Sequence, residues 1–281
     1  MTNKSLVSII IPYYNSGATI DRTLNSIKSQ SWKHIETIII NDGSSEKFSK
    51  DKLNQISKNK KIKLVNQSNL GLASARNSGI LAATGDYILP LDADDWLEPE
   101  AVSQMLLIAR EKGPNTVVYS DIRLHGEISG VKKVFCNPFE QLFSNQLPYC
   151  MLLSREKLKE VDGYDKNFTL GFEDWELNIR LLSTGCNFYN TNTALFNYWV
   201  SKNGMLMSKS LKQYANIFAS IRNKHYSIYT LPSTIKLFIT SRNIDSKRNL
   251  WTYFMLSIVS KVLPRRILSY LLNAYLQKNF K

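Results

Sequence analysis

Apolar runs alternate with segments of helical periodicity along the first 120 residues of the chain. The apolar runs 6–11, 35–40, 62–65, 87–91 and 116–120 have the length and composition of buried strands. Between them, the segments 18–30, 46–58, 71–83 and 99–111 have the spacing of helices. Strand and helix therefore alternate. That order predicts an α/β fold with an open, mostly parallel, Rossmann-like sheet, right-handed crossovers and helices on both faces.

The pattern is weaker beyond residue 121. The run 148–153 predicts one more strand, and 173–182 predicts a helix that begins with two acidic residues. Three apolar residues of this helix share a face that should pack inward: Trp175, Ile179 and Leu182. The simplest role for the acidic residues is to compensate the helix dipole, with an ion pair from Glu176 to Arg180.

Polar residues follow three of the predicted strands. Pro12 and Tyr14 come after the first strand, Asp42 after the second, and Asp92 and Asp94 after the strand at 87–91. In an open parallel sheet, ligands bind in the crevice outside the carboxyl ends of the strands. We therefore expect these three clusters to converge on one edge of the sheet and to form a site there.

The acidic stretch is the richest in chemistry. Asp92 and Asp94 leave an extended backbone on the same face, so their carboxylates repel each other unless a cation or a proton intervenes. Carboxylates together with phosphate oxygens commonly hold Mg²⁺ or Mn²⁺, which suggests a nucleotide-diphosphate site. The alternative is that this stretch, with Asp95, caps a helix beginning near Glu98. These residues alone support the two interpretations about equally, and the two other polar clusters favour a site.

The net charge of +13 is concentrated at the C-terminus. Residues 205–281 hold eight Lys and five Arg against one acidic residue, which gives +12 and leaves about +1 for the rest. The N-terminus lacks the pattern of a secretory signal, and the three cysteines have no metal-ligand spacing. No apolar run reaches the roughly 20 residues that span a bilayer. We therefore expect a cytoplasmic protein with reduced thiols.

The basic C-terminal region predicts two amphipathic helices, at 250–259 and 267–275, with aromatic residues beside the charges. Such helices can lie in the interface of an anionic membrane. They can also simply pack on the rest of the protein with their charges in water. Nucleic-acid binding is disfavoured, because no recognised nucleic-acid motif is present.

Five motifs, taken together, resemble glycosyltransferases of family 2 with the GT-A nucleotide-sugar fold. They are VSIIIPYYN at 7–15, INDGS at 40–44, NLGLASARNSG at 69–79, LDADD at 91–95 and GFEDW at 171–175. The resemblance covers roughly residues 5–208. It implies a transferase domain over 1–208, followed by a basic helical extension over 209–281.

The resemblance implies a role for each motif. Nucleotide-binding residues are expected at Pro12, Tyr14, Asp42, Arg76 and Asp92. Family members invert the anomeric centre in one displacement, which makes Asp174 the expected catalytic base, with Glu173 and Trp175 on the acceptor side. By itself, Arg76 could equally be an exposed helix charge. Asp94, with Asp92, is the expected ligand of a divalent metal, Mn²⁺ or Mg²⁺.

One position departs from the family pattern. Many relatives complete the metal site with a histidine where this chain has Ser201, and a hydroxyl is a much poorer ligand for such ions. Metal binding is therefore expected to rest on Asp94, phosphate and water. His34, His125 and His225 lie elsewhere in the sequence and are interpreted as surface or core residues.

Two functions remain open at this point. The first is a transferase on the inner face of the cytoplasmic membrane, moving a sugar from a nucleotide donor, UDP by resemblance, to a glycan or lipid-linked acceptor in cell-surface polysaccharide synthesis. The second is a catalytically weak or inactive membrane-associated binding subunit of a glycan synthase. A nucleotidyltransferase is disfavoured, because the glycine-rich, lysine-bearing phosphate loop is absent. Assembly into a homo-oligomer is left open.

Overall fold

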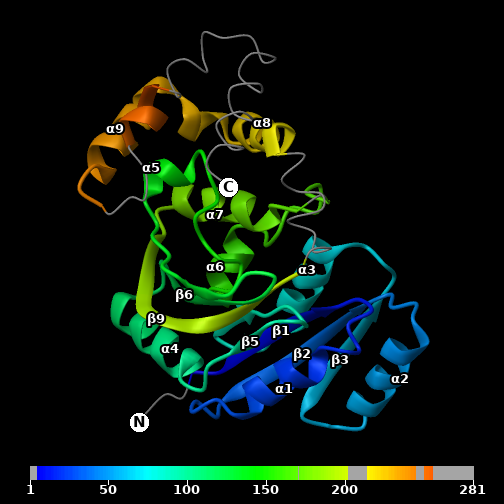
Figure 1. The fold of residues 1–281 in the computed structure, drawn as a ribbon. Coiled ribbons are helices and arrows are strands. Elements are labelled where there is room, and N and C mark those ends of the chain that lie inside the picture. Colours follow the sequence, from blue (N-terminus) through cyan, green and yellow to red (C-terminus); the bar gives the residue numbers. More distant parts are fainter. Residues whose placement is uncertain (1–4, 170, 202–213, 245–249, 256–281) are drawn as a thin grey trace. The chain divides into compact units, whose positions relative to one another are not determined.

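The computed structural model describes residues 5–169, 171–201, 214–244 and 250–255. The chain divides into two compact units, each described here by itself (Figure 1). The sheet unit comprises 1–134, 148–169 and 185–201, and the helical unit comprises 135–147, 170–184 and 202–281. The boundary predicted at 208/209 lies outside the described residues. The helical unit also includes two segments from the middle of the chain, which the sequence pattern assigned to the first domain.

The sheet unit is built on a nine-stranded sheet. One half is parallel, in the order β3 (Ile62–Gln67), β2 (Ile35–Asp42), β1 (Val7–Tyr13) and β4 (Tyr87–Pro90). The other half continues with β8 (Leu152–Ser154), β6 (Thr116–Gly126), β9 (Asn187–Val200) and β5 (Trp96–Leu97), while β7 (Gly130–Lys132) pairs with β6. In this half only β6 and β9 are parallel. The predicted α/β class is confirmed.

Helices cover both faces of the parallel half, as the order of the strands requires. The chain moves outward from β1 to β2 and β3 through α1 (Ile20–Lys28) and α2 (Lys47–Ile56), then returns to β4 through α3 (Leu72–Ala82). Right-handed crossovers in opposite directions put α1 and α2 on one face and α3 on the other (Figure 1). Every residue of β1 is buried, as its continuous apolar run predicted.

Close packing fixes α3 on the sheet. A Cβ atom at Gly79 would lie 2.9 Å from Cβ of Ile10 on β1, so only glycine permits this approach. Arg76 lies one turn earlier on the same helix. The packing at Gly79 therefore also sets where the guanidinium of Arg76 lies relative to the strand ends.

The later strands differ from the prediction. β6 runs to Gly126, beyond the predicted end at 120, because it pairs with β9 along most of its length. The strand predicted at 148–153 is confined to Leu152–Ser154. Residues 148–151 are irregular, and Tyr149 among them bonds to the acidic loop instead of extending a strand. Two further helices belong to this unit, α4 (Ala101–Lys112) and α6 (Arg155–Glu160).

The helical unit has an aromatic core. Its elements are α5 (Pro138–Gln141), α7 (Glu173–Ser183), α8 (Tyr214–Lys224), the 3₁₀ helix η3 (Tyr226–Tyr229), α9 (Leu231–Ser241) and helical residues 250–255. Trp175 is fully buried and stacks on Tyr214 at 5.3 Å between ring centroids. Ile179 is buried as predicted, whereas Leu182 is only half-buried and Leu181 takes the buried position.

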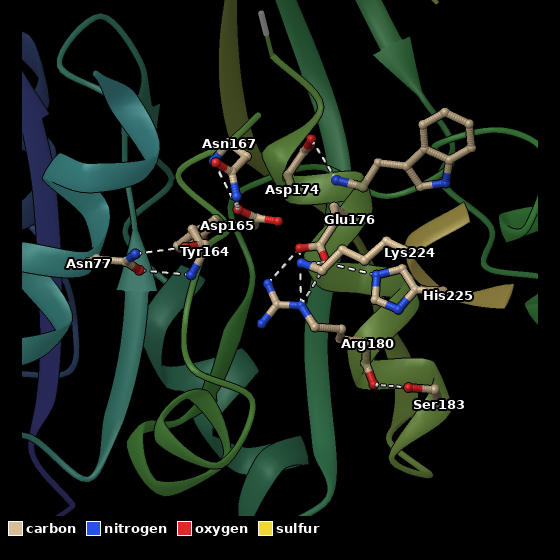
Figure 2. A network of polar contacts seen from close by, with 11 residues as sticks. Asn77, Tyr164, Asp165, Asn167, Asp174, Glu176, Arg180, Ser183, Lys224 and His225 are labelled. Atoms are coloured by element: carbon tan, nitrogen blue, oxygen red, sulfur yellow. Dashed lines mark hydrogen bonds and ion pairs between the residues drawn. The ribbon is translucent and has the colours of Figure 1, made fainter. Parts of the chain in front are cut away.

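Glu176 joins α7 to the end of α8. Its fully buried carboxylate accepts hydrogen bonds from Arg180 at 2.6 Å, Lys224 at 2.7 Å and His225 at 2.8 Å (Figure 2). Burial by itself raises the pKa of Glu176, but the bonds from His225, Arg180 and Lys224 outweigh burial and lower it to about 2. The predicted pair with Arg180 is therefore one part of a larger buried network.

Replacing Glu176 should destabilise the protein in a pH-dependent way. At pH 7 we expect Glu176→Gln to lower the free energy of unfolding by about 3 kcal/mol, because the cations lose their buried partner. The wild-type contribution is present above the unfolded pKa near 4.5 and is lost as the pH falls toward about 2. The difference between the two proteins in urea unfolding should therefore shrink over that range.

The matched control is Glu160→Gln, which breaks the more exposed pair of Glu160 with Lys157. We expect this change to cost less than about 1 kcal/mol at every pH. A Glu176→Gln effect that stays constant from pH 7 to pH 3 would contradict the role given to the buried carboxylate.

Candidate functional site

The carboxyl ends of β1, β2 and β4 lie together at one edge of the sheet. In the strand register, Pro12 is opposite Ile40 on one side, and Ile10 is opposite Pro90 on the other. The backbone N–H of Leu91 donates to Ile10 at 3.0 Å, which holds the start of the acidic loop beside β1. The predicted convergence is confirmed for the first loop, Asp42 and the acidic loop. β1 and β4 also flank the point where the strand order reverses, which is the usual ligand position in such sheets.

Asp42 organises the loop that precedes α3. Its buried carboxylate accepts hydrogen bonds from the side chain of Gln67 at 2.7 Å and from the N–H groups of Leu70 at 2.8 Å and Gly71 at 2.9 Å. These bonds use three of the about four acceptor positions of a carboxylate. The expected contact between Asp42 and a nucleotide base stays a prediction.

The first loop presents an aromatic ring at the surface. Asn15, in a left-handed conformation at φ 51°, accepts the N–H groups of Ser45 and Glu46 and so ties the first loop to the loop after β2. Pro12 is buried beneath, whereas Tyr14 is 47% exposed. The ring of Tyr14 is thus available as a stacking surface.

Arg76 is buried and neutralises Asp92. Its Nη2 donates to both carboxylate oxygens of Asp92, at 2.9 and 3.2 Å. The guanidinium also lies over the rings of Tyr149 and Tyr164, at 4.7 and 5.3 Å from their centroids. Next to it, Asn77 exchanges two 2.7 Å hydrogen bonds with the backbone of Tyr164 (Figure 2). The alternative that Arg76 is an exposed helix charge is wrong.

Asp94 is held by a second arginine, from α1. Arg22 donates to the backbone carbonyl of Asp94 at 2.7 Å, and its guanidinium lies over Trp96 and Trp199, at 3.7 and 4.9 Å. The environment of the Asp94 side chain disfavours its ionised form. Burial, and then the charge of Asp92, raise its pKa to about 6.

Asp95 holds the acidic loop through hydrogen bonds and does not cap a helix. α4 begins at Ala101, with no side-chain hydrogen bond at its N-cap. Asp95 is buried and accepts from the hydroxyl of Tyr149 and from the N–H of Trp199. The Tyr149 hydroxyl also accepts the N–H of Asp92 at 3.0 Å. Burial, followed by the charges of Asp94 and Asp92, raises the pKa of Asp95 well above its usual value. The capping alternative is therefore wrong.

The acidic loop fits a divalent cation as one part of a larger ligand set. Arg76 compensates Asp92, whereas burial and the charge of Asp92 raise the pKa of Asp94, a setting in which a nearby cation would stabilise the carboxylate. Within the residues that the structure describes, no three His, Cys, Asp or Glu side chains form a metal-binding group. A cation here therefore needs oxygens from a bound diphosphate and from water, which is how Mg²⁺ is usually held.

The expected base and acceptor residues belong to the helical unit, at the start of α7. Phe172, at the N-cap, has a left-handed backbone with φ 63°. The carboxylate of Asp174 accepts the N–H of Trp175 at 2.8 Å and the side-chain amide of Asn145 at 2.9 Å. Glu173 is buried. The positions of these residues relative to the acidic loop stay a prediction.

Trp175 was expected beside the acceptor, and its side chain is fully buried in the aromatic core. Its indole N–H donates to the carbonyl of Gln141 at 2.8 Å. In this arrangement the ring anchors the first turn of α7 on α5. Its visible contribution is thus to fix the backbone that carries Asp174.

Sequence reasoning missed four residues that hold the expected site residues: Arg22, Tyr149, Tyr164 and Asn145. Each acts on a partner that is distant in sequence, and none belongs to a recognised motif. Tyr149 was placed within the predicted strand 148–153, and Tyr164 lies outside every predicted element. Asn145 and Arg22 had no local signal.

Comparisons with known proteins agree with this geometry. The family model of Glycosyl transferase family 2 matches residues 8–161. The Escherichia coli UDP-Glc:alpha-D-GlcNAc-diphosphoundecaprenol beta-1,3-glucosyltransferase WfaP is 32% identical over 237 residues, 80% of this chain and 91% of that protein. The amylovoran biosynthesis glycosyltransferase AmsB of Erwinia amylovora is 27% identical over 284 residues, 89% of this chain and 90% of that protein.

Solved structures of S. aureus TarS have the same fold. The complex of TarS 1-349 with UDP-GlcNAc superposes with a TM-score of 0.65 at 18% identity, covering 77% of this chain and 65% of that chain. The complex with UDP gives 0.61 at 16% identity, covering 92% and 82%. This likeness concerns the fold, and it confirms the predicted GT-A architecture.

Removing the hydroxyl of Tyr149 should loosen the acidic loop. We expect Tyr149→Phe to lower the free energy of unfolding by about 1–3 kcal/mol, because the buried Asp95 carboxylate and the Asp92 N–H each lose a partner. Urea unfolding at pH 7 measures the change. The control Tyr87→Phe, on the strand that leads into the same loop, should stay within about 0.5 kcal/mol of wild type. Equal effects of the two substitutions would contradict the conclusion that the Tyr149 hydroxyl stabilises the acidic loop.

Proposed function

Because this chain belongs to glycosyl transferase family 2 and is a glycosyltransferase of polysaccharide biosynthesis, we propose that it moves a hexose from a UDP-sugar to a hydroxyl group of a lipid-linked glycan. The observation that carries the proposal is the acidic loop at the switch point of the sheet, where Asp94 lies two residues after Asp92 and Asp92 is paired to Arg76. The printed name of WfaP, with a UDP-sugar donor and a diphosphoundecaprenol acceptor, supports the choice of substrates.

In this proposal the donor nucleotide lies along the sheet edge. Tyr14 stacks on the base, Pro12 and Asp42 border it, and the diphosphate reaches the acidic loop, where Arg76 keeps Asp92 in place. Asp94 and Asp92 would hold Mn²⁺ or Mg²⁺ together with the diphosphate. When bound, the cation supplies positive charge that stabilises the departing diphosphate.

Transfer is proposed as a single displacement that inverts the anomeric centre. The acceptor hydroxyl gives its proton to the carboxylate of Asp174 as its oxygen bonds to the anomeric carbon. The bond from that carbon to the diphosphate breaks, and UDP leaves with the electron pair. Glu173, next to Asp174, is proposed to orient the acceptor.

The test of the base is Asp174→Asn. Loss of a general base should lower transfer by about 10²–10⁴-fold, while calorimetry with UDP and Mn²⁺ should give an unchanged affinity. A panel of nucleotide sugars that begins with UDP-glucose identifies the donor. Asp51→Asn, an exposed carboxylate on α2, should leave both quantities at the wild-type level. Turnover retained in Asp174→Asn would exclude this residue as the base.

The competing function is a binding subunit without turnover, which the sequence suggested through Ser201. The same calorimetry and a donor-hydrolysis assay separate the two functions. Binding of UDP with neither hydrolysis nor transfer for any donor in the panel would favour the subunit.

We further propose attachment to the inner face of the cytoplasmic membrane through the helical unit. Trp251 and Phe254 pack on Phe238 of α9, yet Trp251 remains 62% and Met255 55% exposed. Lys236 and Arg242 are exposed on the same segment of chain. Among the described residues, no helix has the length and apolarity to cross a bilayer. The predicted helix 267–275 and most of 250–259 lie outside the described residues.

Co-sedimentation with vesicles tests this attachment. The protein should bind vesicles that contain anionic lipid and be released by salt. Removing two charges, in Lys236→Ala with Arg242→Ala, should weaken binding roughly 30-fold, at about 1 kcal/mol per cation. The control pair, Lys58→Ala with Lys60→Ala in the sheet unit, should bind as wild type. Equal binding to neutral vesicles would contradict the electrostatic part of the proposal.

A further inference from the structure

The carboxylate of Asp174 is held at both oxygens. Oδ1 accepts the backbone N–H of Trp175 at 2.8 Å, and Oδ2 accepts the side-chain N–H of Asn145 at 2.9 Å. The first bond is fixed by the helix itself. The second comes from the segment after α5, about 30 residues earlier in the chain, so its direction depends on what holds Asn145.

A chain of hydrogen bonds fixes the amide of Asn145. The backbone N–H of Gln146 can only donate, and it donates to Oε1 of Gln141 at 3.0 Å. The Nε2 group of Gln141 therefore faces Asn145 and donates to its Oδ1 at 3.2 Å. Asn178 on α7 donates to the same oxygen at 3.3 Å. With its oxygen accepting two amides, Asn145 must present its NH₂ group to Asp174.

The supports of this chain are buried and local to the helical unit. Gln141 and Asn178 are fully buried, and Gln146 is held in turn because its side-chain oxygen accepts the N–H of Asn137 at 2.9 Å. Asn137 caps α5 by accepting the N–H groups of Phe139 and Glu140. The hydrogen bonds of the short segment from α5 to Gln146 therefore fix the orientation of the Asn145 side-chain amide.

We infer that Asn145 is a positioning residue that keeps Asp174 ionised and aims its carboxylate during transfer. This inference rests on the proposed role of Asp174 as the base. A donor on a carboxylate favours its charged form, and only the charged form can take the proton of an acceptor hydroxyl. By fixing Oδ2, Asn145 also restricts rotation of the carboxylate, which sets the direction in which that proton is accepted.

The experiment is the pH dependence of kcat/KM in Asn145 variants. Asn145→Ala should lower kcat/KM at pH 7 roughly tenfold and move the acid limb of the profile to higher pH by about half a unit or more. Asn145→Asp, nearly isosteric, places a second carboxylate beside Asp174 and should move the limb further in the same direction. The affinity for UDP should not change in either variant.

Among the described residues, the other titratable groups on α5, on α7 and against Glu176 are unchanged by these substitutions. They are Glu173 and Glu176 on α7, Arg180 on the same helix, Glu140 on α5, and Lys224 and His225 beside Glu176. A moved acid limb therefore reports the contact between Asn145 and Asp174. Thr234→Val is the matched control, because it removes a buried hydroxyl of the same unit whose hydrogen bonds go to the carbonyls of Thr230 and Leu231 and not to the segment that holds Asn145. It should lower stability and leave the limb in place.

Two failures are distinguishable. If Asp174→Asn abolishes transfer while Asn145→Ala and Asn145→Asp keep the wild-type acid limb, the inference about Asn145 is overturned and the proposed function stands. If Asp174→Asn retains transfer, the proposed function itself fails. A limb that moves equally in Thr234→Val would reduce Asn145 to a purely structural residue.

Discussion

Repulsion among three carboxylates within four residues is the constraint on which the sheet unit depends. The loop after β4 carries Asp92, Asp94 and Asp95, and the surroundings of the three carboxylates differ. Asp92 receives the buried charge of Arg76, and Asp95 receives a phenol and a backbone N–H. At Asp94, burial and the charge of Asp92 raise the pKa of the carboxyl group to about 6. The loop is therefore held at Asp92 and Asp95, and additional positive charge would stabilise its crowded carboxylates.

In the helical unit, hydrogen-bond donors hold the carboxylate of Asp174. Here Asp174 stands on the first turn of α7 and is held by two N–H donors, one of which belongs to an amide oriented through a chain of four residues. Trp175 sits beneath in the aromatic core and fixes the same turn. Both units thus hold carboxylates with supports from distant segments. In our proposal, one unit binds the donor and the other takes the proton of the acceptor.

The sequence predicted the fold well because the buried strands are short, continuous apolar runs that leave few alternatives, as in β1. It predicted which residues gather at the edge of the sheet where they lie at or just after strand ends, as Asp42 and Asp92 do. It failed where contacts join segments that are distant in the sequence: Tyr149, which bonds to Asp92 57 residues away, was assigned to a strand, and Asn145, which bonds to Asp174 29 residues away, was given no role. The role of Asp95 was also open, because local rules describe a cap as readily as a buried hydrogen-bond acceptor.

The most direct measurement is anomalous diffraction at the manganese edge from crystals grown with UDP and Mn²⁺. We expect one peak within coordination distance of Asp94 Oδ and of both phosphates of the diphosphate, with Arg76 still paired to Asp92. A diphosphate bound at the sheet edge without a cation, or a manganese peak remote from Asp94, would contradict the assignment of the acidic loop as the donor site.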